Sequence, residues 1–365
     1  MRRALETIRR TPGLELRLIV TGMHLSPQFG LTLREVEASR IPIAAKVDML
    51  LASDGGAAMA RGIGLALIGM TQALEAWRPD LLLVLGDRGE MLAGALAAVH
   101  MNIPVAHVHG GDLSGTVDEN VRHAISKLSH IHLAATPGAA GRLRRMGEDP
   151  RLVFCVGAPG LDDILRSPIP PRGTVCRRHG IPAAEPYFLI VQHPVVQEAA
   201  AGARQLEETL AAVVPLGRRL VICLPNADAG HSRMREVLKA YRGSRSIHLF
   251  DNLPRADYLG LLAGAEVLVG NSSSGIIEAA SLGTPVVNVG TRQALRERNP
   301  NVLDAGHDRR LIGKAVRKAL HDPRFRRITA RRRNAFGDGR ASERIARVLR
   351  TVALGGTLLS KTFRP

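Results

Sequence analysis

Aromatic residues and cysteines are both scarce in this sequence of 365 residues. Aromatics make up 3% of the chain, with a single tryptophan, so the core must be built from Leu, Val, Ile and Ala. That composition suits buried parallel strands covered by helices. Cys155, Cys176 and Cys223 are odd in number and include no CxxC pair, which argues against a disulfide framework and against a zinc site. We therefore expect a cytoplasmic protein without a bound metal.

Long apolar runs are also missing from the sequence. No run approaches the roughly 18 residues of a membrane span. The Arg-rich opening from Met1 to Arg10 lacks the apolar segment of a signal peptide. We expect a soluble protein with no membrane partner.

Acidic residues are outnumbered by basic ones, and 50 Lys and Arg against 33 Asp and Glu give a formal net charge of +17. Much of the surplus lies near the C-terminus, in Arg326, Arg327, Arg331, Arg332, Arg333, Arg340 and Arg344. No aromatic residues are interleaved with this charge, so the segment lacks the side chains that stack on bases and offers little for base readout. We expect no nucleic-acid partner, and an attraction for phosphorylated ligands is the simpler use of the charge.

Short apolar runs alternate with helical patterns along the chain. The runs are Leu14–Val20, Leu81–Leu85, Pro104–Val108, Ile131–Ala135, Leu152–Val156, Phe188–Val191, Leu220–Leu224, Ile247–Phe250, Val267–Val269 and Pro285–Val289. Helical candidates include Arg61–Trp77, Glu119–Leu128 and Gln205–Val213. Strands that recur between amphipathic helices predict parallel sheets.

A proline-rich break separates the two halves of this pattern. Three prolines lie between Ser167 and Gly173 and interrupt regular structure. We predict an α/β protein with an N-terminal Rossmann-like domain over 1–168, a C-terminal Rossmann-like domain over 173–335, and a terminal helix and tail over 336–365. Such doubly wound sheets bind ligands beyond the carboxyl ends of their strands, here in a cleft between the domains.

The first domain opens on the helix-like segment Arg2–Arg10, whereas a doubly wound domain usually starts with a strand. We expect that its first strand is absent, and that a reading frame extended upstream would encode an apolar strand and an Arg-containing turn. An unfilled strand position leaves neighbouring strands with unpaired backbone groups and destabilises the domain.

Polar residues follow the apolar runs of the first half. Leu81–Leu85 leads into Gly86-Asp87-Arg88, where the aspartate has either a catalytic role or the role of a helix cap. The run ending at Val108 leads into His109 and Asp112. Three carboxylates, on Asp112, Asp118 and Glu119, then fall within eight residues, and with the histidines they offer proton donors and acceptors. The alternative for Asp118 and Glu119 is that they only favour a helix N-terminus.

Polar strand ends recur in the second half, at Gln192-His193-Pro194 and at Pro225–Gly230. Gly270-Asn271-Ser272-Ser273-Ser274-Gly275 leads into a helix that carries Glu278. Small residues at such a turn leave backbone N–H groups and hydroxyls available to hold a phosphate. Arg292, one strand later, can add a charge-assisted contact to a diphosphate.

Taken in order over roughly residues 14–306, these motifs resemble those of the hydrolysing UDP-N-acetylglucosamine 2-epimerases of the sialic and legionaminic acid type. The resemblance implies a GT-B-like fold of two Rossmann-like domains, with UDP held mainly by the second. It also implies substrate-binding roles for His24, Arg88, His193, Asn226, Asp228, Ser272, Ser273, Ser274, Glu278 and Arg292. By this resemblance the serines and His193 and Arg292 contact the phosphates, Glu278 contacts the ribose, and His24 lies near the sugar.

The same resemblance implies the reaction. Loss of the C2 proton and departure of UDP from C1 give a 2-acetamidoglycal, which is hydrated to the epimeric free sugar, N-acetylmannosamine when the substrate is UDP-N-acetylglucosamine. No redox cofactor is needed. A weakly acidic C–H needs a well-placed base, and a cation-like anomeric centre needs carboxylates. Asp87, His109, Asp112 and Asp118 are the predicted catalytic residues.

His109 stands where many members of the family carry Glu. The branch that acts on UDP-2,4-diacetamido-2,4,6-trideoxy sugars also tends to have histidine here, so both substrates stay open. A non-hydrolysing epimerase, a GT-B glycosyltransferase and a catalytically weak nucleotide-sugar-binding protein are also compatible with these motifs. We expect a homo-oligomer, either a dimer or a tetramer.

Overall fold

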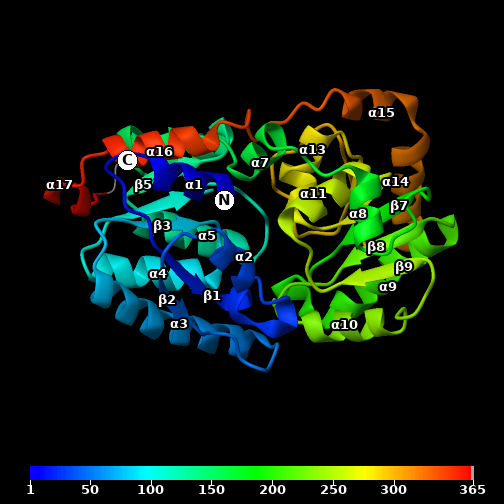
Figure 1. Cartoon of the computed structure of the whole chain (residues 1–365), viewed down its shortest axis with the longest axis horizontal. Coiled ribbons are helices and arrows are strands. Elements are labelled where there is room, and N and C mark those ends of the chain that lie inside the picture. Colours follow the sequence, from blue (N-terminus) through cyan, green and yellow to red (C-terminus); the bar gives the residue numbers. More distant parts are fainter. Residues whose placement is uncertain (363–365) are drawn as a thin grey trace. The chain divides into compact units, whose positions relative to one another are not determined.

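The computed structural model describes residues 1–362 and divides into two compact units (Figure 1). One unit comprises Met1–Leu165 together with the segment from Phe336 onward, and the other comprises Arg166–Ala335. Residues 167–171, with their prolines, form neither helix nor strand. The last three residues of the tail predicted over 336–365 lie outside the described part of the chain.

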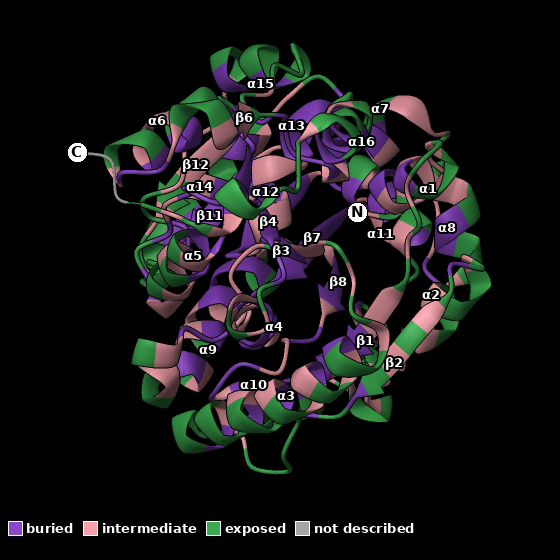
Figure 2. Ribbon diagram, turned by 90° about the vertical axis from the view of Figure 1, so that its left-hand side faces the viewer, coloured by how far each residue is buried: buried purple, intermediate pink, exposed green. Residues whose placement is uncertain are grey.

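Six parallel strands form the sheet of the second unit, in the order β12-β11-β10-β7-β8-β9. Their bounds are β7 Tyr187–Val191, β8 Arg219–Cys223, β9 Ile247–Phe250, β10 Val267–Gly270, β11 Val286–Val289 and β12 Val302–Ala305. Every residue of β7, β10 and β11 is buried, and Figure 2 shows such strands in purple. The order is that of a doubly wound sheet, and it reverses between β7 and β10, where such sheets bind ligands.

Helices flank this sheet in the second unit. They are α8 Arg172–Arg178, α9 Gly202–Val213, α10 His231–Lys239, α11 Arg255–Gly264, α12 Ser273–Ile277, α13 Ala279–Leu282, α14 Arg309–His321 and α15 Pro323–Ala330. Leu206 and Leu210 of α9 and Ile312 of α14 share one core with Phe188 and Ile190 of β7. The apolar runs predicted as strands are therefore buried between helices, as parallel strands require.

The first unit contains two separate parallel sheets. Four strands pair in the order β3-β4-β5-β6, and β1 pairs with β2. Their bounds are β1 Leu18–Thr21, β2 Ile43–Val47, β3 Leu82–Leu85, β4 Val105–Val108, β5 Ile131–Ala134 and β6 Val153–Cys155. Among residues 1–362, no strand joins β1 to β3. Leu85, at the end of β3, is 36% exposed, whereas all of β4 is buried.

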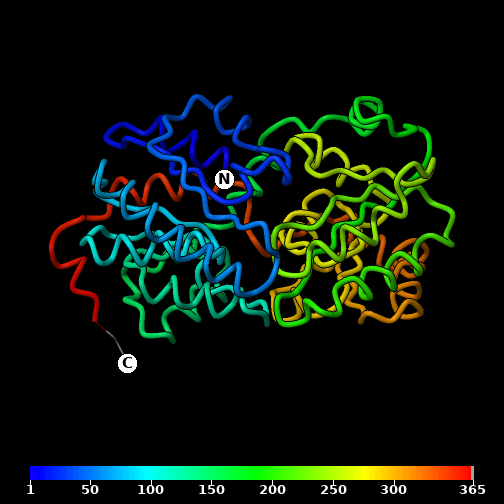
Figure 3. Tube along the Cα trace, turned by 90° about the horizontal axis from the view of Figure 1, so that it is seen from below, coloured from blue at the N-terminus to red at the C-terminus, as the bar shows by residue number. Residues whose placement is uncertain are grey.

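Helices from both ends of the chain pack together in this unit. They are α1 Arg2–Arg10, α2 Leu33–Ala38, α3 Gly56–Trp77, α4 Gly89–His100, α5 Val117–Leu128, α6 Pro137–Arg145, α7 Gly160–Arg166, α16 Ala341–Thr351 and α17 Gly356–Leu359. Ala4 and Ile8 of α1 share a core with Ile345 and Leu349 of α16. In Figure 3 the C-terminal segment of this unit, in red, accordingly lies among its blue and cyan N-terminal segments.

One helix of the described residues, α3, is long and apolar enough to cross a membrane by length and composition, although Arg61 and Glu75 interrupt its apolar residues. This helix has 22 residues and is only partly buried. Buried Ala58, Gly62, Ala66, Met70 and Leu74 recur every four residues and form its inward face. A single helix that passes such a test is weak evidence for a membrane span, because core helices of soluble proteins pass it too.

Candidate active site

In the first unit, the buried Arg122 of α5 connects the ends of two strands. Its guanidinium forms an ion pair with Asp87, which follows β3, and donates hydrogen bonds to the carbonyl oxygen of Asp112 (2.8 Å) and to Ser114 Oγ (3.3 Å). The Arg122 side chain is 1% exposed, so its charge requires the Asp87 carboxylate as a counter-ion. Asp87 therefore has a structural partner that its place in the sequence does not reveal.

His109 and Asp112 form a hydrogen-bonded pair after β4. His109 Nδ1 lies 3.1 Å from Asp112 Oδ2, and the two side chains are 14% and 5% exposed. With the carboxylate accepting the Nδ1 proton, the neutral ring presents Nε2 as a proton acceptor. His109 has a φ of 65°, a left-handed conformation that is strained for a residue with a side chain. The arrangement suits a proton-transfer residue that is oriented by a buried acid.

Glu119, on the first turn of α5, holds the loop that contains Asp112. Its Oε2 accepts hydrogen bonds from the N–H groups of Ser114 (2.6 Å) and Gly115 (2.7 Å). Burial alone would raise the pKa of Glu119, but these two N–H donors lower it below its usual value. Of the three clustered carboxylates, Asp112 orients His109 and Glu119 fixes the loop. Asp118 is half-buried on the same turn of α5.

The two predicted substrate-binding residues of the first unit lie on neighbouring turns. His24 belongs to the short helical turn Gly22–Leu25, and its Nδ1 lies 2.7 Å from Thr32 Oγ1. Arg88 Nε lies 3.8 Å from Glu90 Oε1. A side chain at Gly22 would meet the same Glu90 oxygen at 3.4 Å. Glu90, which the sequence motifs do not single out, thus links the two turns.

In the second unit, Asn271 ties the ends of β10 and β7 together. Its Oδ1 accepts the His193 N–H (2.7 Å), and its Nδ2 donates to the His193 carbonyl (2.8 Å). A Cβ at Gly270 would lie 2.2 Å from the Val191 carbonyl oxygen, so only glycine permits this approach. His193 Nδ1 accepts the Asn226 N–H (3.2 Å), which places the ring proton on Nε2. His193 is thereby set as a hydrogen-bond donor at the switch point of the sheet.

Asp228 is buried and contacts Arg292. Its Oδ2 accepts a hydrogen bond from Asn226 Nδ2 (2.7 Å) and lies 3.7 Å from Arg292 Nη2. Arg292 Nη1 also donates to the Asn271 carbonyl (3.4 Å). The Asp228 side chain is 3% exposed. Asp228 and Asn226 together therefore orient the Arg292 side chain.

The three serines of the turn have different surroundings. Ser272 Oγ accepts the Ser274 N–H (3.3 Å) and lies 2.9 Å from Ser274 Oγ, which also bonds to Tyr258. The Ser273 hydroxyl has no hydrogen bond to another residue in the described part of the chain. Ser273 begins α12, a helix of five residues. Ser273 is thus the serine with an available hydroxyl.

Glu278 does not lie within a continuous helix, as the sequence predicted, but at the junction of α12 and α13. Arg255 at the start of α11 binds both of its carboxylate oxygens, at 2.7 and 2.9 Å. Sequence reasoning missed Arg255, because nothing local to either segment indicates a pair 23 residues apart. A ribose contact by Glu278 would use the remaining lone pairs of this carboxylate.

Comparison with known proteins identifies the family of the chain. Residues 6–350 match the model of the UDP-N-acetylglucosamine 2-epimerase family. The chain is 42% identical over 361 residues to the UDP-N,N'-diacetylbacillosamine 2-epimerase (hydrolyzing) of Legionella pneumophila subsp. pneumophila, covering 99% of this chain and 94% of that protein. It is 34% identical over 318 residues to the UDP-N-acetylglucosamine 2-epimerase of Neisseria meningitidis serogroup B, covering 87% and 83%.

Among solved structures, the S. aureus MnaA-UDP co-structure has a TM-score of 0.81 at 20% identity and covers 100% of this chain and 95% of that one. This likeness concerns the fold, and with the parallel sheets described above it confirms the predicted GT-B-like architecture of two Rossmann-like domains. The chain belongs to the UDP-N-acetylglucosamine 2-epimerase family, as the order of its motifs predicts.

Proposed function

We propose that this protein is a hydrolysing 2-epimerase whose substrate is a UDP-2,4-diacetamido-2,4,6-trideoxy sugar. The observation that carries the proposal is the His109–Asp112 pair, because proton removal from C2 requires a base held in one orientation. The 42% identity to a UDP-N,N'-diacetylbacillosamine 2-epimerase favours the diacetamido sugar. UDP-N-acetylglucosamine is the second candidate, supported by the 34% identity to the meningococcal enzyme.

In the proposed reaction, His109 takes the C2 proton while the C1–O bond breaks and its electron pair leaves with UDP. Water then adds OH to C1 and a proton to C2 on the opposite face, which gives the epimeric free sugar. Asp87 and Asp118 supply negative charge near the cation-like anomeric carbon. Asp112 stabilises the imidazolium that forms when His109 takes up the proton.

The second unit is proposed to hold UDP. Ser273 and the Nε2–H of His193 donate to the phosphates, and Arg292 contributes its charge while Asp228 keeps it in place. Glu278 is the proposed ribose contact. A departing diphosphate carries growing negative charge, and fixed donors of this kind stabilise it without reorganisation.

The test is turnover of both UDP-sugars in deuterated water, followed by NMR and mass spectrometry. Free epimeric sugar with deuterium at C2, together with UDP, is the expected result, with the larger kcat/KM for the diacetamido substrate. A UDP-linked epimer would indicate the non-hydrolysing reaction, and binding without turnover would indicate a nucleotide-sugar-binding protein. His109→Gln should lower kcat by about 10² or more, with His321→Gln, an exposed residue at the end of α14, as a matched control.

We further propose a cytoplasmic homo-oligomer. None of the three cysteines forms a disulfide within the described residues, as in a reducing compartment. The outward face of α3 carries exposed Leu65 (44%) and Ile68 (60%), which a second copy of the chain would cover.

A further inference from the structure

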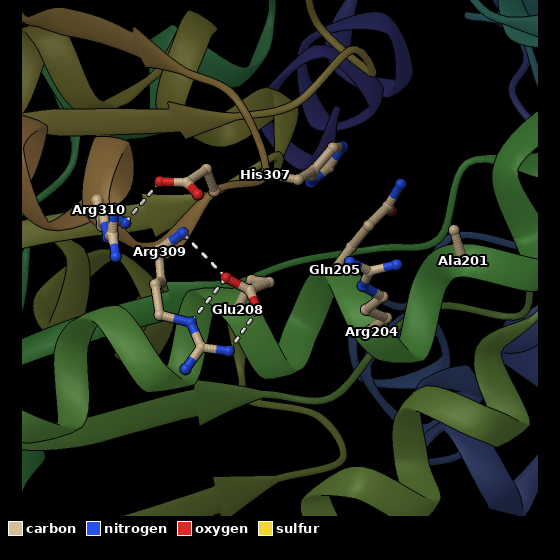
Figure 4. Close-up of a pocket in the computed structure, with 8 residues that line it drawn as sticks. Ala201, Arg204, Gln205, Glu208, His307, Arg309 and Arg310 are labelled. Carbon is tan, nitrogen blue, oxygen red and sulfur yellow. Dashed lines mark hydrogen bonds and ion pairs between the residues drawn. The ribbon is translucent and has the colours of Figure 1, made fainter.

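The second unit contains a cavity of about 620 Å³ that shares no residue with the proposed UDP site. Its walls come from the first turns of α9, the loop between β12 and α14, and the first turn of α14 (Figure 4). The cavity, called here the α9–α14 pocket, is lined by Ala201, Arg204, Gln205, Glu208, His307, Asp308, Arg309 and Arg310. Its volume is within the range of pockets that hold small metabolites.

The acidic groups of this pocket are already engaged within the protein. Glu208 accepts hydrogen bonds from Arg309 Nε (2.9 Å), Nη2 (2.5 Å) and backbone N–H (3.0 Å), and these hydrogen bonds hold the pKa of Glu208 at about 2. Asp308 caps α14 by accepting the N–H groups of Arg310 and Leu311. Neither of these two carboxylates is therefore available to bind a cation.

Two arginines of the pocket are, in contrast, available. Within the described residues, the guanidinium groups of Arg204 and Arg310 form no hydrogen bond or ion pair. In Figure 4, Gln205 and Arg204 project from α9 into the space below the His307 ring. Both ring nitrogens of His307 are buried and form no hydrogen bond within residues 1–362, although Nε2 lies 3.6 Å from Glu198 Oε2. Guanidinium, amide and imidazole groups around one cavity favour an anionic ligand.

A chain of contacts leads from this pocket to the proposed diphosphate site. Gln205 Nε2 donates to Glu198 Oε2 (2.6 Å), and Thr291 Oγ1 donates to Glu198 Oε1 (2.5 Å). His307 Nε2 lies 3.6 Å from Glu198 Oε2. The His307 ring also packs directly on Gly290, where a Cβ would meet it at 2.2 Å. Gly290 and Thr291 are the two residues that precede Arg292.

We propose that the α9–α14 pocket binds the phosphate group of a small phosphorylated metabolite, and that this binding weakens UDP binding through Glu198 and Thr291. The coupling rests on the proposed function, whereas the anion site itself does not. An anion that takes the Gln205 amide removes one of the two donors that hold Glu198. A second negative charge in the same unit also opposes the diphosphate. Coupling between sites is reciprocal, so UDP should weaken anion binding by the same factor.

Calorimetric titration of the full chain with inorganic phosphate, at constant ionic strength set with chloride, tests the site. One phosphate per chain should still bind when UDP saturates the protein, and the double variant Arg204→Ala/Arg310→Ala should bind at least tenfold more weakly. Arg326→Ala/Arg327→Ala, which removes two exposed charges from α15, is the matched control and should bind as the parent does. Undetectable binding at 10 mM phosphate in the parent, or equal binding in all variants, would overturn the site.

The coupling is tested by measuring the UDP dissociation constant with and without saturating phosphate. We expect phosphate to raise it about fivefold in the parent, a typical coupling between sites, and to leave it unchanged in Arg204→Ala/Arg310→Ala. Glu198→Ala should keep phosphate binding but lose the coupling. Phosphate that binds at the pocket without changing UDP affinity in the parent would overturn the coupling. A chain that binds phosphate there but no UDP would contradict the proposed function and leave the anion site standing.

Discussion

At the scale of single residues, the serine turn offers a discriminating test of the UDP site. Ser274 Oγ is bonded to Tyr258 and lies 2.9 Å from Ser272 Oγ, whereas the Ser273 hydroxyl has no such bond within residues 1–362. Ser273→Ala and Arg292→Ala should therefore each weaken UDP binding by about 1.5 to 3 kcal/mol, the range of a hydrogen bond to a charged group. Ser274→Ala should cost clearly less. Calorimetry with UDP gives all three values, and unchanged affinity in the Ser273 and Arg292 variants would move the phosphate site elsewhere.

Asp87 combines a proposed catalytic charge with a structural one, and the two roles can be separated. Asp87→Asn should lower kcat by about 10² while UDP binding stays nearly intact. It should also lower the free energy of unfolding by about 3 kcal/mol, because the buried Arg122 loses its counter-ion.

The double variant Asp87→Asn/Arg122→Met removes that unpaired charge. Its melting temperature should recover most of the loss, while kcat stays low. If kcat recovered along with stability, Asp87 would be a structural residue only, and the catalytic assignment would be wrong.

At the scale of elements, the strands and their polar ends were predictable from sequence, but the ion pairs between elements were not. Buried parallel strands consist of consecutive apolar residues, so β7, Tyr187–Val191, was predicted to within one residue as Phe188–Val191. The strands β2 and β12 were not predicted, because Lys46 interrupts the apolar run of β2 and Asp304 interrupts that of β12. The Arg122–Asp87 pair joins residues 35 apart, a separation that no local pattern indicates.

Another long-range contact fastens the C-terminal segment to α5. Lys361 Nζ donates to the carbonyl oxygens of Ser126 (3.1 Å), Lys127 (2.8 Å) and Ser129 (2.7 Å) and lies 2.6 Å from Glu148 Oε2. Lys361→Ala leaves the last carbonyls of α5 without this donor and should destabilise the first unit by roughly 2 kcal/mol. Thermal unfolding measures the change, with Arg350→Ala, an exposed residue of α16, as the charge-matched control.

The same contact should make stability depend on pH under acidic conditions. Burial would raise the pKa of Glu148, but hydrogen bonds from His132, Lys127 and Lys361 lower it to about 2. A carboxylate whose pKa is depressed in the folded state stabilises the fold above its unfolded pKa of about 4.3. This contribution should be lost as the pH falls from about 4.5 towards 2. Glu148→Gln should flatten the melting-temperature profile in that window, and an unchanged profile would contradict the assignment.

At the scale of the whole molecule, a net charge of +17 makes copies of the chain repel one another, which favours association through a face of low charge. The outward stripe of α3 is such a face: Leu65 and Ile68 are exposed, and the only charged residues along it are Arg61 and Glu75. Ile68 lies midway between those two. Two copies of α3 that cross antiparallel at Ile68 would bring Arg61 beside the partner's Glu75, twice in a two-fold dimer.

This geometry predicts the oligomeric state and its response to charge. Light scattering should give twice the chain mass for the parent. Ile68→Lys and Arg61→Glu should each shift the protein towards the monomer, by inserting a charge at the centre of the interface or by placing like charges opposite each other. Arg61→Glu/Glu75→Arg, which exchanges the two charges, should restore the dimer, whereas Lys46→Glu on β2 should leave the mass unchanged. A parent that is monomeric at all concentrations, or a charge exchange that fails to restore association lost in Arg61→Glu, would exclude this antiparallel interface.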